Sequence, residues 1–199
     1  MYQWRKLTDE QRRAILASRR KNLRPWHSPP HFESAGQQCF HLSAACYEHR
    51  PTIGTAPSRM EDFESKLIEL FSTEGCMLHA WCVLPNHWHA LVRIDDLKEI
   101  IKEIGRLHGR VSFLWNGEDA ERGRKCWHRC LDRRIRSDRH HYVAMNYIHH
   151  NPVKHGYVER WEDWPYSSAN GFIAEAGRAA ALKQWQEYPV LDMGKGWDD

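Results

Sequence analysis

Two histidines separated by a single residue form the first candidate site in the chain. His87 and His89 begin the short run HWHALVRI, residues 87–94. In a β-strand alternate side chains point to the same face, so the two imidazoles would project together. The opposite face of such a strand is entirely apolar and consists of Trp88, Ala90, Val92 and Ile94. The pattern predicts two neighbouring ligands for one metal ion, on a face of the strand that is free for chemistry.

A second candidate site lies in the run HYVAMNYIHHNPVKHGYV, residues 141–158. Helical spacing predicts that the buried side of this segment consists of Val143, Ala144, Met145 and Ile148. Tyr147 and Asn151, four residues apart, fall at one edge of that side and are neighbours on the helix surface. Because Pro152 disfavours helical geometry at the residue before it, we expect the helix to end at Asn151 and the amide to turn inward.

Both patterns also have ordinary explanations. In a chain with 14 histidines, an H-x-H spacing can arise on a surface hairpin without any function, and a tyrosine on an amphipathic helix is usually structural. Tyr142 and Asn146 repeat the spacing of the second site. That pair projects to the polar side of the predicted helix, away from its packed face, so Tyr147 and Asn151 are the preferred pair.

The elements that must position these residues follow from periodicity and from signals for helix ends. Strands are predicted at residues 38–47, 76–84, 87–94 and about 129–135. Helices are predicted to start at three capping signals, which are Thr8 with Gln11, Ser58 with Glu61, and Asp96 with Glu99, and again near Asp138. The order β-α-β-β-α-β predicts an α+β fold, a ferredoxin-like antiparallel sheet with helices packed on one face, plus a C-terminal helix carrying the tyrosine.

The chain divides into three regions by composition. Residues 1–37 form a basic N-terminal helical extension that ends in a linker rich in proline, and residues 38–175 form the main domain. Residues 176–199 are rich in alanine, glycine and acids and are expected to be loosely structured. No apolar run is long enough to cross a membrane, so a soluble, cytoplasmic protein is expected.

Six cysteines occur in the chain, and no C-x-x-C pair is present. Several fall in apolar runs, where free cysteine behaves as a small hydrophobic residue, so reduced thiols are expected. Cys126, His128 and Cys130 are the nearest approach to a zinc pattern, because alternate residues of an extended segment share a face. A fourth ligand is not evident, which weakens this alternative.

Positive charge is concentrated in two segments although the net charge is only +3. Residues 5–24 carry eight Lys and Arg against two acids, and residues 122–141 repeat that balance. Cations bind phosphates, and aromatic side chains stack on exposed bases, so these segments together with 10 tryptophans favour a nucleic-acid partner. Phosphate contacts are expected from Arg129, Arg133, Arg134, Arg136 and Arg139, and base stacking from Trp127 or Trp115.

Both candidate sites resemble motifs of one known family. The stretch LPNHWHALV resembles the HUH motif of the single-tyrosine transposases, and YIHHNPVKHG followed by WPYSS at residues 164–168 resembles their REP-associated branch. Trp127 and the segment 135–137 also fit the segment that connects the two motifs. The resemblance covers about residues 38–172.

The resemblance implies a specific active site. It assigns Tyr147 as the nucleophile and His87, His89 and Asn151 as ligands of a divalent metal, Mg²⁺ or Mn²⁺. It also implies cleavage and rejoining of single-stranded DNA at hairpin elements through a 5′-phosphotyrosine. The sequence leaves open whether the enzyme is a homodimer.

Two other functions remain compatible with the same residues. One is a domesticated DNA-binding module that keeps the fold and no longer cuts. The other is a metal hydrolase that uses a bound water as its nucleophile. The complete set of four site residues argues against the first, and the lack of a clear Asp or Glu partner near the hairpin argues against the second.

Overall fold

The computed structural model describes residues 8, 10, 11, 13, 14 and 17, residues 37–191, and residues 193 and 194. Its centre is a four-stranded antiparallel sheet with the strand order β2-β3-β1-β4. The strands are β1 (Gln38–Ala45), β2 (Cys76–Leu84), β3 (His87–Ile94) and β4 (Leu131–Arg134). The predicted α+β fold and its order of strands and helices are confirmed.

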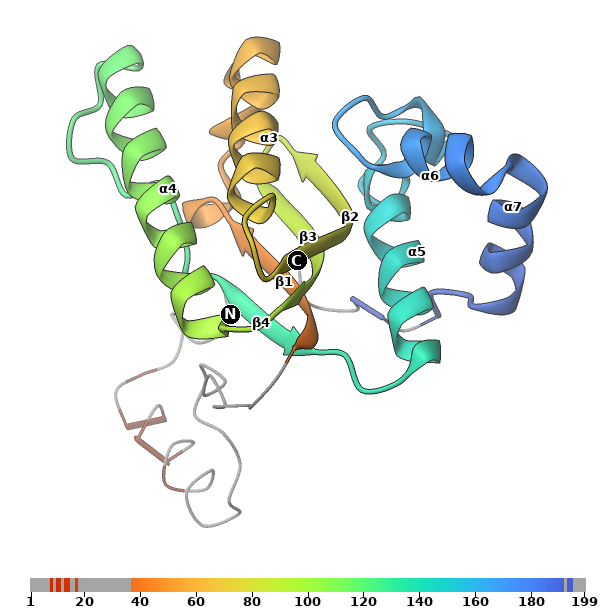
Figure 1. The fold of residues 1–199 in the computed structure, drawn as a ribbon. Coiled ribbons are helices and arrows are strands. Elements are labelled where there is room, and N and C mark those ends of the chain that lie inside the picture. The colour runs from red at the N-terminus through yellow and green to blue at the C-terminus, as the bar shows by residue number, and fades with distance from the viewer. Residues whose placement is uncertain are drawn as a thin grey trace.

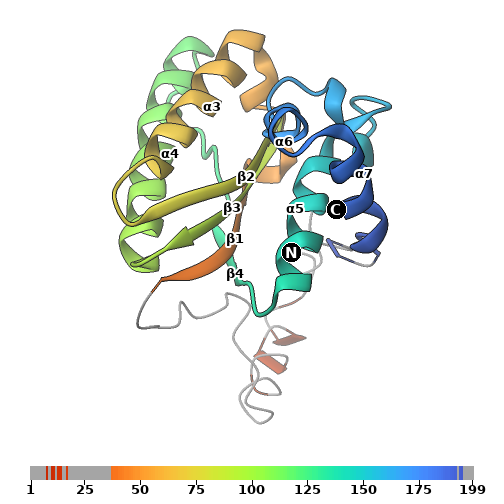
Figure 2. The same ribbon diagram turned by 45° about the vertical axis from the view of Figure 1, so that its right-hand side comes forward.

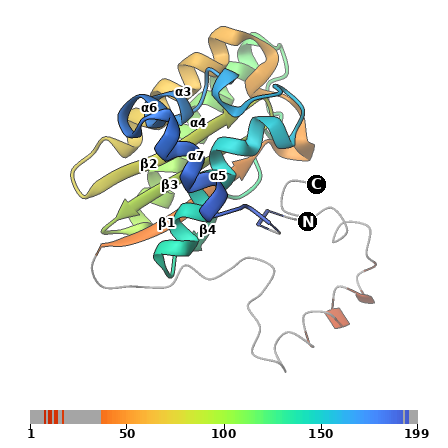
Figure 3. The ribbon, with the colours of Figure 1, turned by 90° about the vertical axis from the view of Figure 1, so that its right-hand side faces the viewer.

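Helices cover both faces of the sheet (Figure 1). On one face lie α3 (Pro57–Phe71) and α4 (Leu97–Glu118), and on the other lies α5 (Asp138–Lys154), which carries Tyr147 and contacts β2 and β3 (Figure 2). Two further helices follow, α6 (Ala169–Ala176) and α7 (Arg178–Glu187), and α7 lies beside α5 (Figure 3). The described short 3-10 turns are η1 (Tyr47–His49), η2 (Ile53–Thr55) and η3 (Trp161–Asp163).

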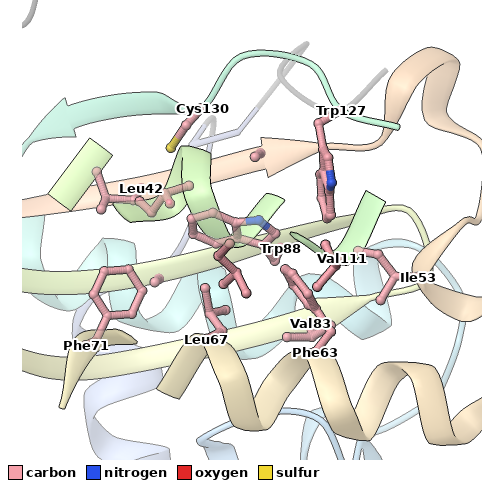
Figure 4. Packing of buried hydrophobic residues seen from close by; sticks show 14 of the residues in the cluster. Leu42, Ile53, Phe63, Leu67, Phe71, Val83, Trp88, Val111, Trp127 and Cys130 are labelled. Atoms are coloured by element: carbon pink, nitrogen blue, oxygen red, sulfur yellow. The ribbon is translucent and has the colours of Figure 1, made fainter. Parts of the chain in front are cut away.

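The main hydrophobic core fills the space between the sheet and the α3–α4 pair (Figure 4). Trp88 of β3, Leu42 of β1 and Phe63 of α3 are fully buried there. Trp127 and Trp115 also belong to this core, and the Trp127 ring stacks on the His108 ring at 4.0 Å. The prediction that these two tryptophans stack on DNA bases is therefore wrong, because their rings already pack against protein.

The structure agrees with three of the four predicted helix starts, and α5 begins at Asp138 as predicted. Thr8 and Gln11 exchange reciprocal hydrogen bonds between side chain and backbone, as a capping box requires. The Asp96 carboxylate accepts from the backbone N–H groups that open α4. The predicted capping box of Ser58 with Glu61 is wrong: α3 begins one residue earlier at Pro57, a residue favoured in the first turn, and its cap residue makes no side-chain hydrogen bond.

The helix α5 does not end at Asn151 as predicted but continues through Pro152 to Lys154. The proline removes one backbone donor, a loss that ordinarily disrupts a helix. Here the next turn is retained, because the His155 N–H donates to the Asn151 carbonyl at 3.1 Å and Pro152 itself is buried. Asn151 therefore approaches the sheet from within a helix.

The region after residue 175 is more ordered than predicted. It contains α7, whose Ala181 is buried, and the segment that follows packs Val190 and Met193 against the side of α5 that faces the sheet. Alanine-rich composition suggested loose structure, although alanine is also the strongest helix former. The N-terminal extension, apart from the six described residues before residue 37, lies outside the part of the chain that the structure describes.

The chain shows no candidate for a membrane span among its described helices. All six cysteines are free thiols. Burial raises the pKa of the Cys46 thiol to about 12, which keeps this side chain protonated and unreactive at neutral pH. No disulfide joins any of the six, and their redox state in the cell stays a prediction.

Candidate active site

The two histidines of the HWH motif lie side by side on the face of the sheet that α5 covers. The β2–β3 turn at Pro85 and Asn86 starts β3 at His87, so His87 and His89 share one face with ring centroids 5.0 Å apart. They are only 2% and 1% exposed. The face that the sequence leaves free for chemistry is therefore not open to solvent, because α5 packs on it and brings its own polar residues to the histidines.

Tyr147 and Asn151 are the residues that α5 contributes. The Tyr147 ring lies edge-on to the His89 ring, with centroids 5.4 Å apart, and Asn151 Oδ1 lies 2.9 Å from His87 Nε2. Both side chains are buried, Tyr147 at 1% and Asn151 at 0% exposure. The structure thus brings together all four predicted site residues, although the two histidines lie more than fifty positions before Tyr147 and Asn151 in the sequence.

Tyr142 and Asn146, the alternative pair, lie on the other side of α5. The Asn146 amide nitrogen donates to the Tyr188 carbonyl at 2.8 Å, and the Tyr142 ring lies 4.8 Å from the Tyr188 ring. This pair therefore points away from the histidines as predicted. It does not face solvent on a polar side, however, because Gln184 of α7 exchanges hydrogen bonds with Asn146 and Tyr188 follows directly after α7.

The hydrogen bonds around His87 define what its second nitrogen can do. Asn86 Nδ2 donates to the His49 carbonyl at 3.3 Å, which leaves Asn86 Oδ1 to accept from His87 Nδ1 at 2.7 Å. In a neutral imidazole, Nε2 of His87 is then an acceptor. It nevertheless lies 2.9 Å from Oδ1 of Asn151, which is another acceptor. With the amide in this orientation two buried acceptors face each other, an arrangement that a shared proton, a bound cation or a rotation of the Asn151 amide relieves.

The donor set fits a divalent metal ion. Two imidazoles and an amide oxygen are all ligands of such ions, and Oδ1 of Asn151 faces Nε2 of His87 at 2.9 Å. No group of three or more His, Cys, Asp and Glu side chains in the described ranges is placed to hold a metal. The zinc alternative is therefore not supported: the Sγ of Cys126 contacts Asn116, and His128 Nε2 accepts from the Glu48 N–H.

Two residues at the site escaped the sequence prediction. His41 of β1 is 3% exposed, and its Nε2 lies 3.1 Å from Nδ1 of His89. Lys154 Nζ lies 3.4 Å from the Tyr147 hydroxyl, to which it donates. Helix or strand periodicity could not identify His41, because its position beside His89 depends on the register between β1 and β3, in which Ser43 pairs with His89. Lys154 was missed because α5 was expected to end before it.

The C-terminal segment closes the site over Tyr147. Gly194 is buried with a positive φ of 81°, and a Cβ at this position would overlap the Tyr147 ring. The Gly194 carbonyl accepts a hydrogen bond from Lys154 at 3.2 Å. The Tyr147 hydroxyl is therefore covered by backbone from this segment.

The five arginines expected to bind phosphate lie in and around β4 and in the first turn of α5: Arg129 precedes β4, Arg133 and Arg134 belong to it, Arg136 follows it, and Arg139 lies in α5. Their side chains are exposed. Arg133 sits directly opposite His41 in the β1–β4 pairing, and it interacts electrostatically with Tyr147. Partial burial lowers the pKa of Arg133 below its ordinary value, and Tyr147 acts in the opposite direction. The basic segment thus reaches the candidate active site at Arg133, although a role in binding DNA stays a prediction.

Comparisons with known proteins identify relatives of this chain. A family described as "Transposase IS200 like" matches residues 38–151. A Haemophilus influenzae protein assigned to the REP-associated tyrosine transposases is 34% identical over 110 residues, covering 45% of this chain and 56% of the relative. A REP-associated tyrosine transposase of Escherichia coli is 32% identical over 101 residues, covering 49% and 56%. The similarity spans little more than half the length of these curated relatives.

A solved structure supports the same fold. It shows a REP-associated tyrosine transposase bound to a REP hairpin, and it matches with a TM-score of 0.57 and 22% identity over 76% of this chain and 87% of that chain. The family match covers more than half of the 199 residues and contains His87, His89, Tyr147 and Asn151. The resemblance seen in the two motifs is thereby confirmed, and the chain belongs to the IS200-like transposase family.

Proposed function

We propose that the protein cleaves and rejoins single-stranded DNA at REP-type hairpins through a covalent link between Tyr147 and a 5′ phosphate. The observation that carries the proposal is the gathering of a tyrosine hydroxyl and a metal-type donor set in one buried site. His89 contacts the Tyr147 ring, and Asn151 contacts His87. The relative solved with a REP hairpin supports the choice of substrate.

The chemistry assigned to Tyr147 is an exchange of one phosphate ester for another. Its hydroxyl oxygen attacks phosphorus and loses its proton, the bond from phosphorus to the 3′ oxygen breaks, and that oxygen takes up a proton. Rejoining is the reverse, so no external energy source is required. A phenol with a pKa near 10 is a weak nucleophile at neutral pH. Lys154, which donates to this hydroxyl, is placed to stabilise negative charge on the oxygen.

His87, His89 and Asn151 would hold the metal ion, Mg²⁺ or Mn²⁺. Such an ion withdraws charge from a non-bridging phosphate oxygen and orients the phosphate for in-line attack. All three donors are uncharged, so the protein leaves the charge of a bound cation to be neutralised by the phosphates of the substrate. A site of this kind favours binding of the metal together with DNA.

The exposed arginines of residues 129–139 are placed to hold the DNA backbone beside the site. Replacing Arg133 and Arg134 with alanine is expected to weaken binding to all single strands alike, because phosphate contacts carry no sequence information. The salt dependence of the binding constant should become shallower by roughly 0.7 per lost phosphate contact. Fluorescence anisotropy over a range of salt concentrations measures both quantities.

Arg106 and Arg110 provide a charge-matched control for this experiment. Both are exposed on α4, on the sheet face away from Tyr147. Their double alanine variant should leave the salt slope unchanged. Equal effects of the two double variants would show that the salt slope depends on the net charge of the protein and not on contacts at residues 129–139. The assignment of these residues to DNA binding would then be wrong.

Hairpin binding without cleavage is a second function, and one observation favours it. Tyr147 is 1% exposed and lies beneath Gly194, so a phosphate cannot reach its hydroxyl in this arrangement. A protein that keeps the segment in place would bind DNA and never form the covalent link. The distinction depends on whether the segment moves.

Ending the chain at Leu191 is expected to raise the initial rate of covalent adduct formation, because Gly194 no longer covers Tyr147. If the segment contributes about 1.4 kcal/mol to the closed form, the rise is roughly tenfold. Rates are measured with labelled hairpin DNA at a fixed Mn²⁺ concentration. An unchanged rate would mean that the segment leaves the tyrosine readily in the full chain.

The proposed activity is tested directly with the full-length protein. Incubation with 5′-labelled and 3′-labelled hairpin DNA and Mn²⁺ should yield a protein–DNA adduct that resists SDS, and only the label 3′ of the cut should remain with the protein. Tight hairpin binding without an adduct, in both the full chain and the chain ending at Leu191, would favour the non-cutting module. Cleavage without an adduct would indicate attack by water, as in a metal hydrolase.

A further inference from the structure

We infer that His41 is a positioning residue of the proposed metal centre. It accepts a hydrogen bond from Nδ1 of His89 and thereby holds Nε2 of His89 ready to bind the metal. The inference rests on the proposed function and extends it to a residue outside both sequence motifs. His41 lies on β1, whereas the HWH motif lies on β3.

The contact between the two rings is close and fully enclosed. Nε2 of His41 lies 3.1 Å from Nδ1 of His89, the ring centroids are 5.1 Å apart, and the two side chains are 3% and 1% exposed. The His41 ring also lies edge-on to Tyr147 at 5.8 Å. His41 therefore packs between the β1–β3 pair and the helix that carries the tyrosine, where its orientation can fix that of His89.

The hydrogen bonds of His87 show how an acceptor at Nδ1 orients a histidine of this motif. Its Nδ1 donates to Asn86 Oδ1, and its Nε2 is directed at Asn151. His41 occupies the equivalent position for His89: a neighbouring acceptor at Nδ1, with Nε2 on the far side of the ring. Nε2 of His89 is buried, so it is held inside the protein and not in solvent. Each histidine of the motif thus has its Nδ1 held by a side chain of its own.

The direction of the hydrogen bond decides whether His89 can bind a metal. If His89 Nδ1 donates to His41, the lone pair of His89 is on Nε2, and this nitrogen can bind the ion. If His41 donates instead, Nε2 of His89 carries the proton and cannot bind. Partners of this kind fix the tautomer and the ring orientation of metal-binding histidines.

A histidine suits this position better than a carboxylate. A buried carboxylate would carry a charge with a large desolvation cost and would need its own partners. A neutral imidazole supplies an acceptor without that cost, and it keeps the whole donor set uncharged. The acceptor at His87 is also uncharged, since it is the amide oxygen of Asn86.

The test measures Mn²⁺ binding without DNA, by the loss of the free-ion signal in electron paramagnetic resonance. The variants are His41→Phe, which keeps a packed ring without an acceptor, and His41→Gln, which restores an acceptor. His149→Phe is the matched control, since His149 is a fully buried histidine of α5 whose Nε2 contacts Ser168 and not the site. Melting temperatures establish that each variant is folded.

We expect His41→Phe to lower Mn²⁺ affinity by roughly 10- to 100-fold, the usual effect of losing such a partner. His41→Gln should recover most of the loss, and His149→Phe should bind as the wild type does. Equal affinities in wild type and His41→Phe would overturn the inference while leaving the metal centre intact. Equal losses in both His41 variants would also overturn it, because packing alone would then explain the effect.

Two further readouts keep the result unambiguous. If the wild type binds no Mn²⁺, even with hairpin DNA added, the proposed metal centre itself fails, and the role of His41 fails with it. If His41→Phe does not fold, nitrogen-15 spectra of the wild-type histidines with Zn²⁺ decide the matter. The inference requires His89 to carry its proton on Nδ1, and a proton on Nε2 would overturn it.

Discussion

Replacing Tyr147 with phenylalanine is expected to abolish the SDS-resistant adduct completely, because the hydroxyl oxygen that attacks phosphorus is gone. Hairpin affinity should change by less than about twofold, since the ring and its packing against His89 are retained. The change in folding free energy should also be small. Removing the hydroxyl deletes the hydrogen bond from Lys154, which at 3.4 Å is long and therefore weak.

Tyr142→Phe is the matched control for this result. Tyr142 lies on the same helix with its ring against Tyr188, on the side away from His87 and His89. The control variant should form adduct at the wild-type rate. An adduct that persists in Tyr147→Phe and disappears in Tyr142→Phe would assign the reaction to the other face of α5.

The pairing of Tyr147 with Asn151 could be predicted because helix periodicity is a local property. A spacing of four residues places two side chains together whatever surrounds the helix, and strand alternation does the same for His87 and His89. The fold class followed from the order of such segments. Each of these predictions needs only the sequence of one helix or strand and of the turn next to it.

The covering of the site could not be predicted in the same way. Helical spacing indicated which side of α5 faces the sheet, but not that α7 would cover the side with Tyr142 and Asn146. Gly194 and Tyr147 are in contact although they lie 47 positions apart in the sequence. A glycine has no side chain whose type or spacing could indicate this contact. A polar stripe in the sequence therefore shows only that this side of the helix does not pack against the sheet. It does not show that the side is exposed to solvent.

Local rules also failed where tertiary packing outweighed them. Pro152 should end a helix, yet α5 continues because the proline is buried and the following backbone donors find acceptors within the same turn. That extra turn places Lys154 at the tyrosine hydroxyl. His41 illustrates a second limit, because its contact with His89 depends on the register between β1 and β3, which distant parts of the sheet determine.

Replacing either His87 or His89 with alanine is expected to stop cleavage while the protein remains folded. Each change removes one of two imidazoles from the proposed metal centre, and loss of one electrostatic stabiliser of a transition state typically costs roughly 10²- to 10³-fold in rate. Mn²⁺ binding should fall in parallel. Hairpin affinity measured in EDTA should match that of the wild type, because DNA is held by the arginine surface and not by the histidines.

Chelation distinguishes this metal from a structural one. A folding ion contributes most of the stability of its domain, whereas the core between the sheet and α3–α4 contains none of the proposed ligands. EDTA should therefore abolish cleavage by the wild type and lower its melting temperature only slightly. A control with His149→Ala, another buried histidine, should lose stability and keep Mn²⁺ affinity. Unfolding of the wild type in EDTA would instead identify the ion as part of the fold, and the roles proposed for His87 and His89 would have to be abandoned.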